Sequence, residues 1–326
     1  MTLNLLIKLP IATATVFRSF FPNTFSGVHS PYGYANFGFK EIALNAQKYS
    51  DRSLYNQPLN PELKKSQKEL SKPHFDLIQS FSVQKAGNLL TECEDIWHCA
   101  KRNPMVSIAL SDGATESSFA REWAQELVTA FVNRQLPWQE VYAMAANWLS
   151  PLQTSWQQWL VHQDLSWFAK RKAGEGAFAT FVSLEVFANL TWKALAVGDS
   201  CLFIVRDRCL QTSFPLQKSQ EFNNRPKLIG TNVKATNIHV SQIHGDAKFG
   251  DRFYLATDAI ACWIFKQLEA NQDPWVKLDE ISSQDLFAEW VTELRDRHEI
   301  ANDDTTLLCL KIQDATEIPM SQSCES

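Results

Sequence analysis

Aspartates stand where several apolar runs of this chain end. Asp258 ends the run Phe253 to Thr257, and Asp112 follows the run Val106 to Ser111. The other members of the set are Asp95, Asp199 and Asp303. A carboxylate placed at the end of a buried run is costly unless something pairs with it. We therefore expect these side chains, scattered over some two hundred residues, to converge on a hard cation.

The residue types in this set favour magnesium or manganese. Mg²⁺ and Mn²⁺ prefer carboxylate, carbonyl and water oxygens in octahedral geometry, and no His or Cys cluster accompanies the aspartates to suit zinc. Two such ions ~4 Å apart can share a bridging hydroxide and hold a phosphate in line for attack. Gly113 follows Asp112, and because it has no Cβ its carbonyl is a further candidate ligand.

Each aspartate also has an ordinary structural explanation. A single Asp before a turn is more often a cap or turn residue than a ligand, and only the joint pattern reverses this for Asp112, Asp258 and Asp303. For Asp199 both interpretations, metal ligand and turn residue, stay open, because Gly198-Asp199-Ser200 also makes a good hairpin turn. We expect Asp304 to be a solvated neighbour of the preceding aspartate. The scattered histidines are interpreted as structural or surface residues.

Five short motifs resemble those of the metal-dependent type 2C serine/threonine protein phosphatases, in the same order and with similar spacing. They are Glu94-Asp95, Ser111 to Thr115, Ala196 to Ser200, Leu255 to Ala259 and Asn302 to Thr306, with Gly176 to Thr180 resembling the family's small-residue strand start. Each motif alone is weak, but five in order are a strong signal. The resemblance runs from about residue 76 to 313. It implies an α+β fold, a four-layer αββα sandwich in which two antiparallel sheets are flanked by helices and the metals lie in a cleft at one end.

The resemblance also implies roles for the aspartates. Asp112 would bridge two Mn²⁺ or Mg²⁺ ions, the carbonyl of Gly113 would bind one of them, and Asp258 and Asp303 would complete the other. Asp112, Asp258 and Asp303 are thus the candidate catalytic residues. The bridging hydroxide would attack phosphorus on phosphoserine or phosphothreonine proteins, and the metals would offset the developing charge.

The resemblance gives the outer positions of the site weaker roles. Asp95 would act through a metal-bound water, with Glu94 nearby. Asp199 matches the position that bacterial members use for a third, weaker metal. Together with the inner set, the implied metal ligands are Asp95, Asp112, Gly113, Asp199, Asp258 and Asp303.

The chain departs from the family pattern at several points. Ala114 to Glu116 replace the usual x-Gly-Gly, and Ala259 stands where glycine is common. Asn88 to Leu90 occupy a stretch in which some members carry a phosphate-holding arginine, and the second motif lacks a histidine that could protonate the leaving group. A bacterial subgroup with Asp-Gly-Ala and Thr-Asp-Ala motifs shares these changes, so we expect activity. The alternative is a weak or inactive pseudophosphatase that binds a phosphoprotein or a partner.

Composition limits the classes of protein to which this chain can belong. Of 326 residues, 45% are hydrophobic and 21% charged, which is ordinary for a globular protein with a sizeable core. With a net charge of -5, the chain lacks the excess of positive charge typical of proteins that bind nucleic acid, so no nucleic acid is expected as a partner. No segment reaches the ~20 apolar residues of a membrane helix, so no membrane is expected. Seven cysteines without a Cys-x-x-Cys pair indicate a reducing cytosol. We expect a cytoplasmic monomer that acts on phosphorylated proteins.

Three regions are predicted along the chain. Residues 1–75 form an extension that is poorly structured or accessory, residues 76–314 the phosphatase-like domain, and residues 315–326 a tail. A further hypothesis is that the extension docks on a membrane or a partner through Leu3 to Phe21.

Hydrophobic periodicity predicts the elements of the domain. The strands are expected at 76–83, 93–99, 106–110, 177–187, 190–197, 201–206, 253–257 and 305–312. A helix after Gly113 is expected to be capped by Thr115, Ser117 or Ser118, and a second one, opened by Pro137, to be interrupted at Pro151. A third helix carries Trp156, Trp159, Leu160, Trp167 and Phe168, which are assigned to the core, with Gly174 as its C-cap and Lys170 to Lys172 near its end. Residues 208–224 are expected to form a loop or flap, and 260–268 and 286–294 to be helical.

Overall fold

A computed structural model describes residues 72–133, 145–223, 225–234 and 237–317. The chain divides into two units, Met1–Gln67 and Lys68–Ser326, and all described residues belong to the second. The strands are β1 (Pro73–Val83), β2 (Ile96–Arg102), β3 (Met105–Ser111), β4 (Phe178–Ala179), β5 (Phe181–Phe187), β6 (Thr191–Val197), β7 (Cys201–Arg206), β8 (Cys209–Phe214), β9 (Ile229–Gly230), β10 (Ser241–Asp246), β11 (Arg252–Ala256) and β12 (Thr305–Asp314). The α-helices are α1 (Ala120–Val132), α3 (Ala145–Val161), α4 (Trp167–Gly174), α5 (Asp258–Glu269), α6 (Pro274–Glu280) and α7 (Gln284–Asp296), and the 3-10 helices are η3 (Leu90–Glu92), η4 (Ser219–Glu221) and η6 (Ala315–Glu317).

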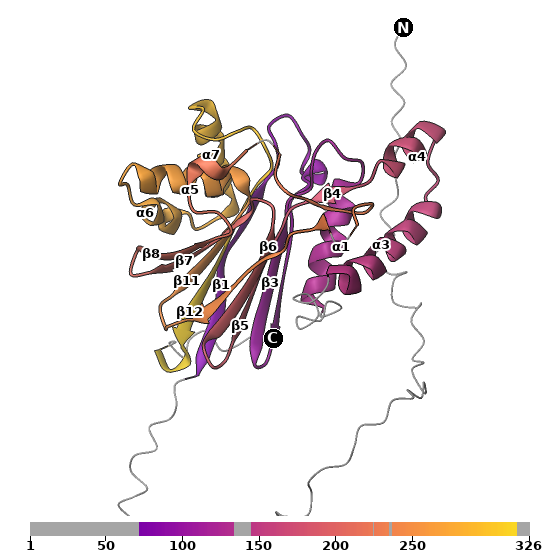
Figure 1. Ribbon diagram of the computed structural model, residues 1–326. Helices are drawn as coiled ribbons and strands as arrows, with labels where there is room; N and C mark the ends of the chain where they lie inside the picture. Colours follow the sequence, from indigo (N-terminus) through magenta and orange to yellow (C-terminus); the bar gives the residue numbers. More distant parts are fainter. Residues whose placement is uncertain (1–71, 134–144, 224, 235–236, 318–326) are drawn as a thin grey trace, which may run out of the picture. The chain divides into compact units, whose positions relative to one another are not determined.

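Two five-stranded antiparallel sheets form the body of this unit (Figure 1). One sheet has the strand order β1-β12-β11-β7-β8, and the other has the order β10-β6-β5-β3-β2. Strands β4 and β9 form a short third sheet. These sheets and their flanking helices confirm the predicted α+β class. The limits proposed for the extension and the tail stay predictions.

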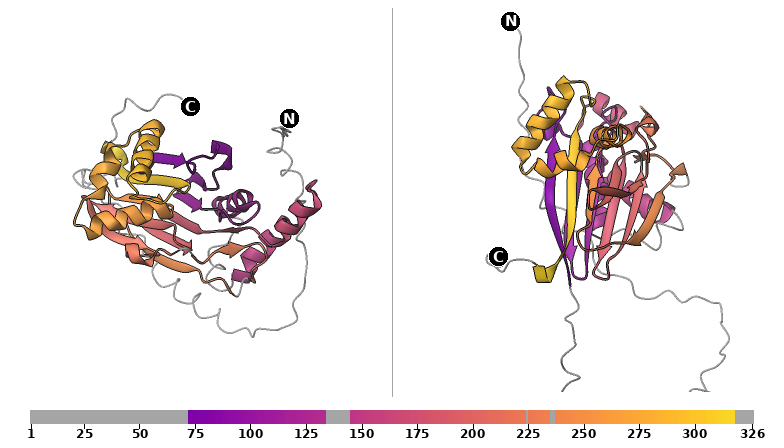
Figure 2. Two further views of the ribbon diagram at one scale, coloured as in Figure 1. Left: turned by 90° about the horizontal axis from the view of Figure 1, so that it is seen from above. Right: turned by 90° about the vertical axis from the view of Figure 1, so that its left-hand side faces the viewer.

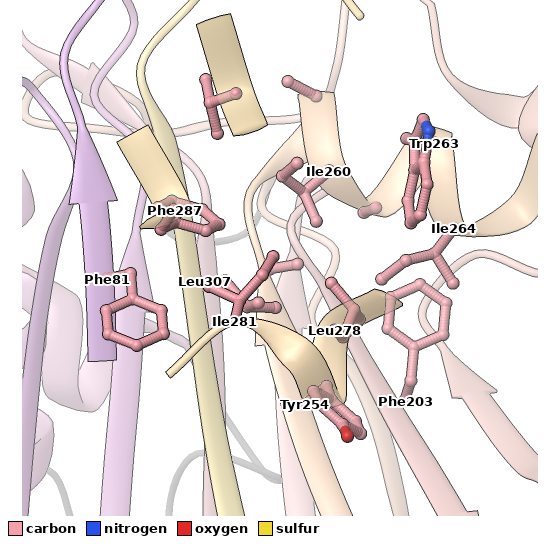
Figure 3. Close-up of a cluster of buried hydrophobic side chains, with 14 of the residues drawn as sticks. Phe81, Phe203, Tyr254, Ile260, Trp263, Ile264, Leu278, Ile281, Phe287 and Leu307 are labelled. Atoms are coloured by element: carbon pink, nitrogen blue, oxygen red, sulfur yellow. The ribbon is translucent and has the colours of Figure 1, made fainter. Parts of the chain in front are cut away.

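Successive side chains along each strand of the first sheet point to opposite faces, and both faces are buried. Leu202, Leu255 and Leu308 belong to the cluster that includes inward residues of the second sheet, whereas Phe203 and Tyr254 belong to a cluster with the C-terminal helices. Figure 3 shows this second cluster, in which Phe81, Phe203, Tyr254 and Leu307 from strands meet Ile260 and Ile264 of α5, Leu278 of α6 and Phe287 of α7. The helices α5, α6 and α7 therefore cover the outer face of the first sheet.

The second sheet packs against α1 and α3 through a third cluster. Ala109, Phe181 and Leu195 from its strands contact a set that includes Trp123 of α1 and Trp156 of α3. The rings of Trp123 and Trp156 meet edge to face, with their centroids 5.5 Å apart. Figure 2 shows the two sheets and their helices from above and from the side.

The start of α1 differs from the prediction. The helix begins at Ala120, and its N-cap Phe119 has a left-handed φ of 64° with no side-chain cap. The hydroxyl of Ser117, one of the expected caps, donates to the carbonyl of Ala114 and accepts from the amide of Phe178. It therefore fastens the preceding loop to β4 instead of closing the helix.

The tryptophan-rich region was predicted in part. Pro151 lies inside α3 and does not interrupt it; the helix loses one backbone donor there, while the buried side chains of Leu149 and Leu152 still anchor it on the core. The helix expected to open at Pro137 lies outside the described residues. Trp156 is buried, as expected for a core residue, and so is Trp148.

The expected third helix is two helices, separated at residues 162–166. Ser166 caps α4 by accepting from the amide of Ala169 at 3.3 Å. Trp167 and Phe168, in the first turn of α4, are 76% and 53% exposed, so their assignment to the core was wrong.

The end of α4 and the region after β7 also differ from expectation. Gly174 is the last residue of α4, Glu175 is its C-cap, and the left-handed conformation falls on Gly176, whose φ is 98°. Residues 208–224 contain β8, paired with β7, and η4, so they are not a free flap. Among the described residues no helix has both the length and the apolar character needed to cross a bilayer.

Candidate functional site

The antiparallel register brings the motif aspartates to one end of the paired sheets. In the second sheet, Asp95 directly precedes β2 and Asp112 directly follows β3, and the neighbouring residues Ile96 and Ser111 are paired. Leu110 of β3 pairs in turn with Val182 of β5, so the start of β5 lies at the same end of the sheet.

The first sheet contributes its own carboxylates at the corresponding end. Asp199 lies just before β7, and Asp258 lies just after β11; Cys201 of β7 pairs with Ala256 of β11. Asp303 lies just before β12, whose Leu307 also pairs with Ala256. Sequence reasoning placed these residues at strand ends, and antiparallel pairing turns that into a common location.

The electrostatics of Asp112 reflect the other four aspartates at this end of the sheets. Burial raises its pKa most, and the negative charges of Asp95, Asp258, Asp303 and Asp199 raise it further. Coulombic repulsion falls with distance, so a carboxylate repelled by four others marks the point where five separate segments meet. The structure therefore gathers all five aspartates into one acidic cluster.

Two carboxylates of this acidic cluster have a buried oxygen with no hydrogen-bond partner among the described residues. Asp95 accepts from the Thr257 hydroxyl through Oδ2 at 3.1 Å, while its Oδ1 is unpartnered. Oδ1 of Asp258 is likewise buried and unpartnered. Burial, followed by repulsion from Asp199 and Asp303, raises the pKa of Asp258 to about 7. These oxygens are acceptors that the described part of the protein does not satisfy.

The remaining carboxylates of this end follow the same trend. Burial raises the pKa of Asp199 to about 6, with a contribution from the charge of Asp303. Burial also raises the pKa of Glu94, and a hydrogen bond from Thr115 partly opposes it. Burial and the charges of Asp304 and other neighbours raise the pKa of Asp95. Each shift has the sign expected for carboxylates that are short of positive charge.

Positive side chains near the acidic cluster bind backbone carbonyls. Arg295 donates through Nη2 to the carbonyl of Asp303 at 2.6 Å, and Arg121 donates to the carbonyl of Cys93. Within the described ranges, no ion pair joins a lysine or arginine to an aspartate of the cluster. The charge of Arg295 still interacts with Asp303 and Asp304, but the cluster keeps an excess of negative charge in this part of the protein.

The donor set suits Mg²⁺ or Mn²⁺, because it consists of carboxylate oxygens, two of which are buried and unpartnered. As the side chains stand in the described residues, no three of His, Cys, Asp or Glu are close enough together to hold an ion. The chemistry of the site thus fits a hard divalent cation, while the number of ions and their individual ligands stay predictions.

Asp304 corrects one expectation. It is only 7% exposed, and it is not a solvated neighbour of Asp303. Its Oδ1 accepts from the amide of Lys85 at 2.7 Å, and its Oδ2 accepts from the amide of Glu94 at 2.6 Å. Hydrogen bonds to a charged acceptor are among the stronger ones, so Asp304 ties the end of β1 and the first acidic pair to the last motif.

Gly113 and Gly198 are needed for space as well as for conformation. A Cβ on Gly113 would lie 3.0 Å from atoms of Ala120 and Glu94, so the missing side chain lets α1 approach the acidic pair. Gly198 has a left-handed φ of 101°, and a Cβ there would lie 2.8 Å from Thr180. The carbonyl of Gly113 as a metal ligand stays a prediction.

Thr180 holds the backbone of Asp112 in place, which sequence reasoning did not foresee. Its amide donates to the carbonyl of Asp112 at 2.8 Å, and its hydroxyl accepts from the amide of Asp112 at 3.2 Å. The same hydroxyl lies 2.7 Å from that of Ser200, beside Asp199. The strand start from Gly176 to Thr180 was noted only as part of a motif, and nothing in its composition indicated this contact.

Comparison with known proteins shows a shared fold at low sequence similarity. No protein-family model matches the sequence, and no curated protein matches it. Among solved structures, serine/threonine phosphatase Stp1 from Staphylococcus aureus is similar with a TM-score of 0.51 and 15% identity, covering 75% of this chain and 96% of that one. The catalytic domain of serine/threonine protein phosphatase PstP, in complex with two manganese ions, has a TM-score of 0.47 and 16% identity over 74% of this chain and 99% of that one. The structural neighbours are phosphatases of the type 2C class, and the likeness to Stp1 shows that this chain has their fold.

Proposed function

We propose that this chain hydrolyses phosphoserine and phosphothreonine monoesters on proteins with the help of Mn²⁺ or Mg²⁺. The observation that carries the proposal is the convergence of five carboxylates, none in an ion pair with a described lysine or arginine, at one end of a phosphatase-like fold. Buried like charges are costly, so such a cluster is hard to explain as a device for stability. It is readily explained as a set of ligands for divalent cations.

The roles proposed for the individual ligands are those that the resemblance to the type 2C phosphatases implies. Asp112, Asp258 and Asp303 would hold two ions together with the carbonyl of Gly113, and Asp95 and Asp199 would act from the periphery of the cluster. Bound divalent cations there would activate water and offset the charge that develops on the phosphoryl oxygens.

The chain's other residues fix the geometry of these ligands. The hydroxyl of Thr257 orients Asp95 by donating to Oδ2, and it also accepts from the amide of Thr306 at 2.9 Å. Arg295 holds the backbone of Asp303 by donating to its carbonyl. Contacts of this kind set the orientation of metal ligands and are worth about tenfold to a hundredfold in metal affinity or activity.

The test is the hydrolysis of p-nitrophenyl phosphate and of a phosphoserine peptide with and without Mn²⁺. We expect turnover that depends on Mn²⁺ and falls by roughly a hundredfold or more in Asp258→Asn. Asp246→Asn, in the exposed part of β10, is the matched control and is expected to keep wild-type turnover. Equal turnover with and without metal, or in Asp258→Asn and wild type, contradicts the proposal.

The second candidate is a pseudophosphatase that keeps the fold and binds a phosphoprotein. It is favoured by one observation: Leu89 and Leu90, in the stretch where some family members carry an arginine, are 68% and 65% exposed and offer a phosphate no charge. Calorimetric titration with Mn²⁺ separates the candidates. Tight binding of metal without hydrolysis of any phosphosubstrate supports the pseudophosphatase, and measured turnover excludes it.

A further inference from the structure

Helix α4, labelled in Figure 1, carries exposed aromatic and basic side chains, and its Lys172 lines a cavity together with residues of the loop that follows Gly113. Trp167 and Phe168 are 76% and 53% exposed, and their rings meet edge to face with centroids 6.0 Å apart. Large aromatic side chains grouped on a surface mark contact sites more often than isolated ones do. Their exposure has no explanation in the packing of the described domain.

The basic residues of α4 extend the same surface. Lys170, Arg171 and Lys172 are all exposed, and none forms an ion pair with a described residue. The guanidinium of Arg171 lies over the ring of Phe168, 5.6 Å from its centroid. Phe168 and Lys172 are four residues apart and so share one face of the helix. We call the surface formed by Trp167, Phe168, Lys170, Arg171 and Lys172 the α4 surface.

A cavity joins the α4 surface to the acidic cluster's motif loop. It has a volume of about 220 Å³ and is lined by Lys172 of α4 and by Ala114, which directly follows Gly113. Phe178 and Leu228 give it an apolar wall. A molecule that occupies this cavity therefore touches α4 at one end and the residue after a candidate ligand at the other.

We propose that the α4 surface and this cavity bind the segment of a phosphoprotein substrate that flanks the phosphorylated residue, with an apolar side chain in the cavity and acidic residues over α4. Charge complementarity carries the choice of occupant. The chain as a whole has a net charge of -5, so three successive cations with no ion pair to a described residue are a local exception. The inference rests on the proposed function, because it names the substrate class of that same site.

The charges that line the cavity limit where acidic residues of the substrate can lie. Glu116 and Glu175 contribute to its wall together with Lys172, so the cavity itself does not attract an anion. An apolar side chain suits the cavity, and carboxylates of the same peptide would be placed outward over Lys170 and Arg171. Opposite charges at an exposed rim raise the association rate and select partners more than they raise affinity.

The test compares two phosphoserine peptides that differ in their flanks. One carries Leu and Glu residues, and the other carries Ala and Lys at the same positions. Anisotropy of fluorescein-labelled peptides gives binding, and kcat/KM relative to p-nitrophenyl phosphate gives discrimination. We expect the wild type to prefer the acidic peptide, and the double variants Trp167→Ala/Phe168→Ala and Lys170→Glu/Arg171→Glu to lose about tenfold of that preference through KM. Val276→Ala/Leu286→Ala, which removes exposed apolar side chains on α6 and α7, is the matched control.

Each outcome decides the inference. Equal preference in wild type and α4 variants overturns it. Binding of wild type to vesicles of phosphatidylcholine and phosphatidylserine, lost in the α4 variants while peptide preference stays unchanged, overturns it in favour of a lipid surface. Absence of p-nitrophenyl phosphate turnover in the Mn²⁺-loaded wild type contradicts the proposed function instead, and the anisotropy of the two peptides still decides whether the α4 surface binds acidic segments.

Discussion

The acidic cluster and the α4 surface both hold charges without described partners, but they differ in burial. In the cluster, burial and mutual repulsion raise the pKa values of Asp95, Asp112 and Asp258. On α4, Trp167 and the adjacent basic residues are open to solvent. An unpaired charge costs free energy when it is buried, as in the acidic cluster, and costs little when it is exposed to solvent, as on the α4 surface. The contrast supports the proposals that the cluster binds metal ions and that the α4 surface binds a segment of the substrate.

The largest contrast is expected between two tryptophans of the same region. Trp156→Ala removes a side chain that is 3% exposed and packs on Trp123, and should lower the free energy of unfolding by about 3–5 kcal/mol. Trp167→Ala removes an exposed ring and should change it by no more than about 0.5 kcal/mol. Urea unfolding followed by circular dichroism measures both. A similar loss in the two variants would show that α4 is part of the core and would break the comparison.

The second contrast concerns the effect of metal on stability. Mn²⁺ at a hundred times its dissociation constant should stabilise the wild type by about 2.7 kcal/mol, because the folded protein binds it and the unfolded chain does not. Asp258→Asn should lose most of this gain, while Lys170→Glu/Arg171→Glu should keep it. Thermal unfolding with and without Mn²⁺ gives the shift. An unchanged shift in Asp258→Asn would remove this residue from the ligand set.

Two adjacent aspartates sharpen the comparison within the acidic cluster. Asp304→Ala leaves the amides of Lys85 and Glu94 without their acceptor and should cost about 2 kcal/mol of stability. Asp303→Ala removes one bond from a neighbouring amide but relieves repulsion on Asp112 and Asp258, so we expect a change below about 1 kcal/mol. Chemical denaturation of the metal-free variants tests this order, and equal losses would contradict it.

The sequence predicted those features that depend on residues close together in the chain. Carboxylates interrupt apolar runs visibly, so Asp112 and Asp258 could be recognised, and short runs of β-prone apolar residues placed β7 and β12 almost to the residue. Burial by distant segments leaves no such trace. Asp304 next to Asp303 looked solvated because its two donors come from residues 85 and 94, more than two hundred positions away.

The spacing of the tryptophans along the helices was likewise not enough to predict their burial. A stripe predicts that one face of a helix is apolar, but it does not tell whether another element covers that face. Trp156 meets α1, while Trp167, beyond the break after Val161, is exposed. Caps were ambiguous for a related reason, since the hydroxyl of Ser117 serves β4 and not α1. What could not be predicted in these cases was whether segments far apart in the sequence make contact.

The smallest expected effect is the pH dependence of the metal-free protein. The pKa of Asp258 is raised from 3.8 to about 7 in the folded state. The protonated carboxyl is therefore favoured by folding, so its contribution is fully present below pH 3.8 and is lost as the pH rises through about 7. Between pH 6 and pH 7.5 we expect the metal-free wild type to lose about 1 kcal/mol from this group, and Asp258→Asn to lose less. Trp167→Ala/Phe168→Ala should follow the wild type, because no titratable group of the acidic cluster lies on α4. Urea unfolding at the two pH values in the presence of a chelator measures the difference. A metal-free protein that gains stability over this range would show that its buried carboxylates are paired after all, and the distinction between the two regions would fail.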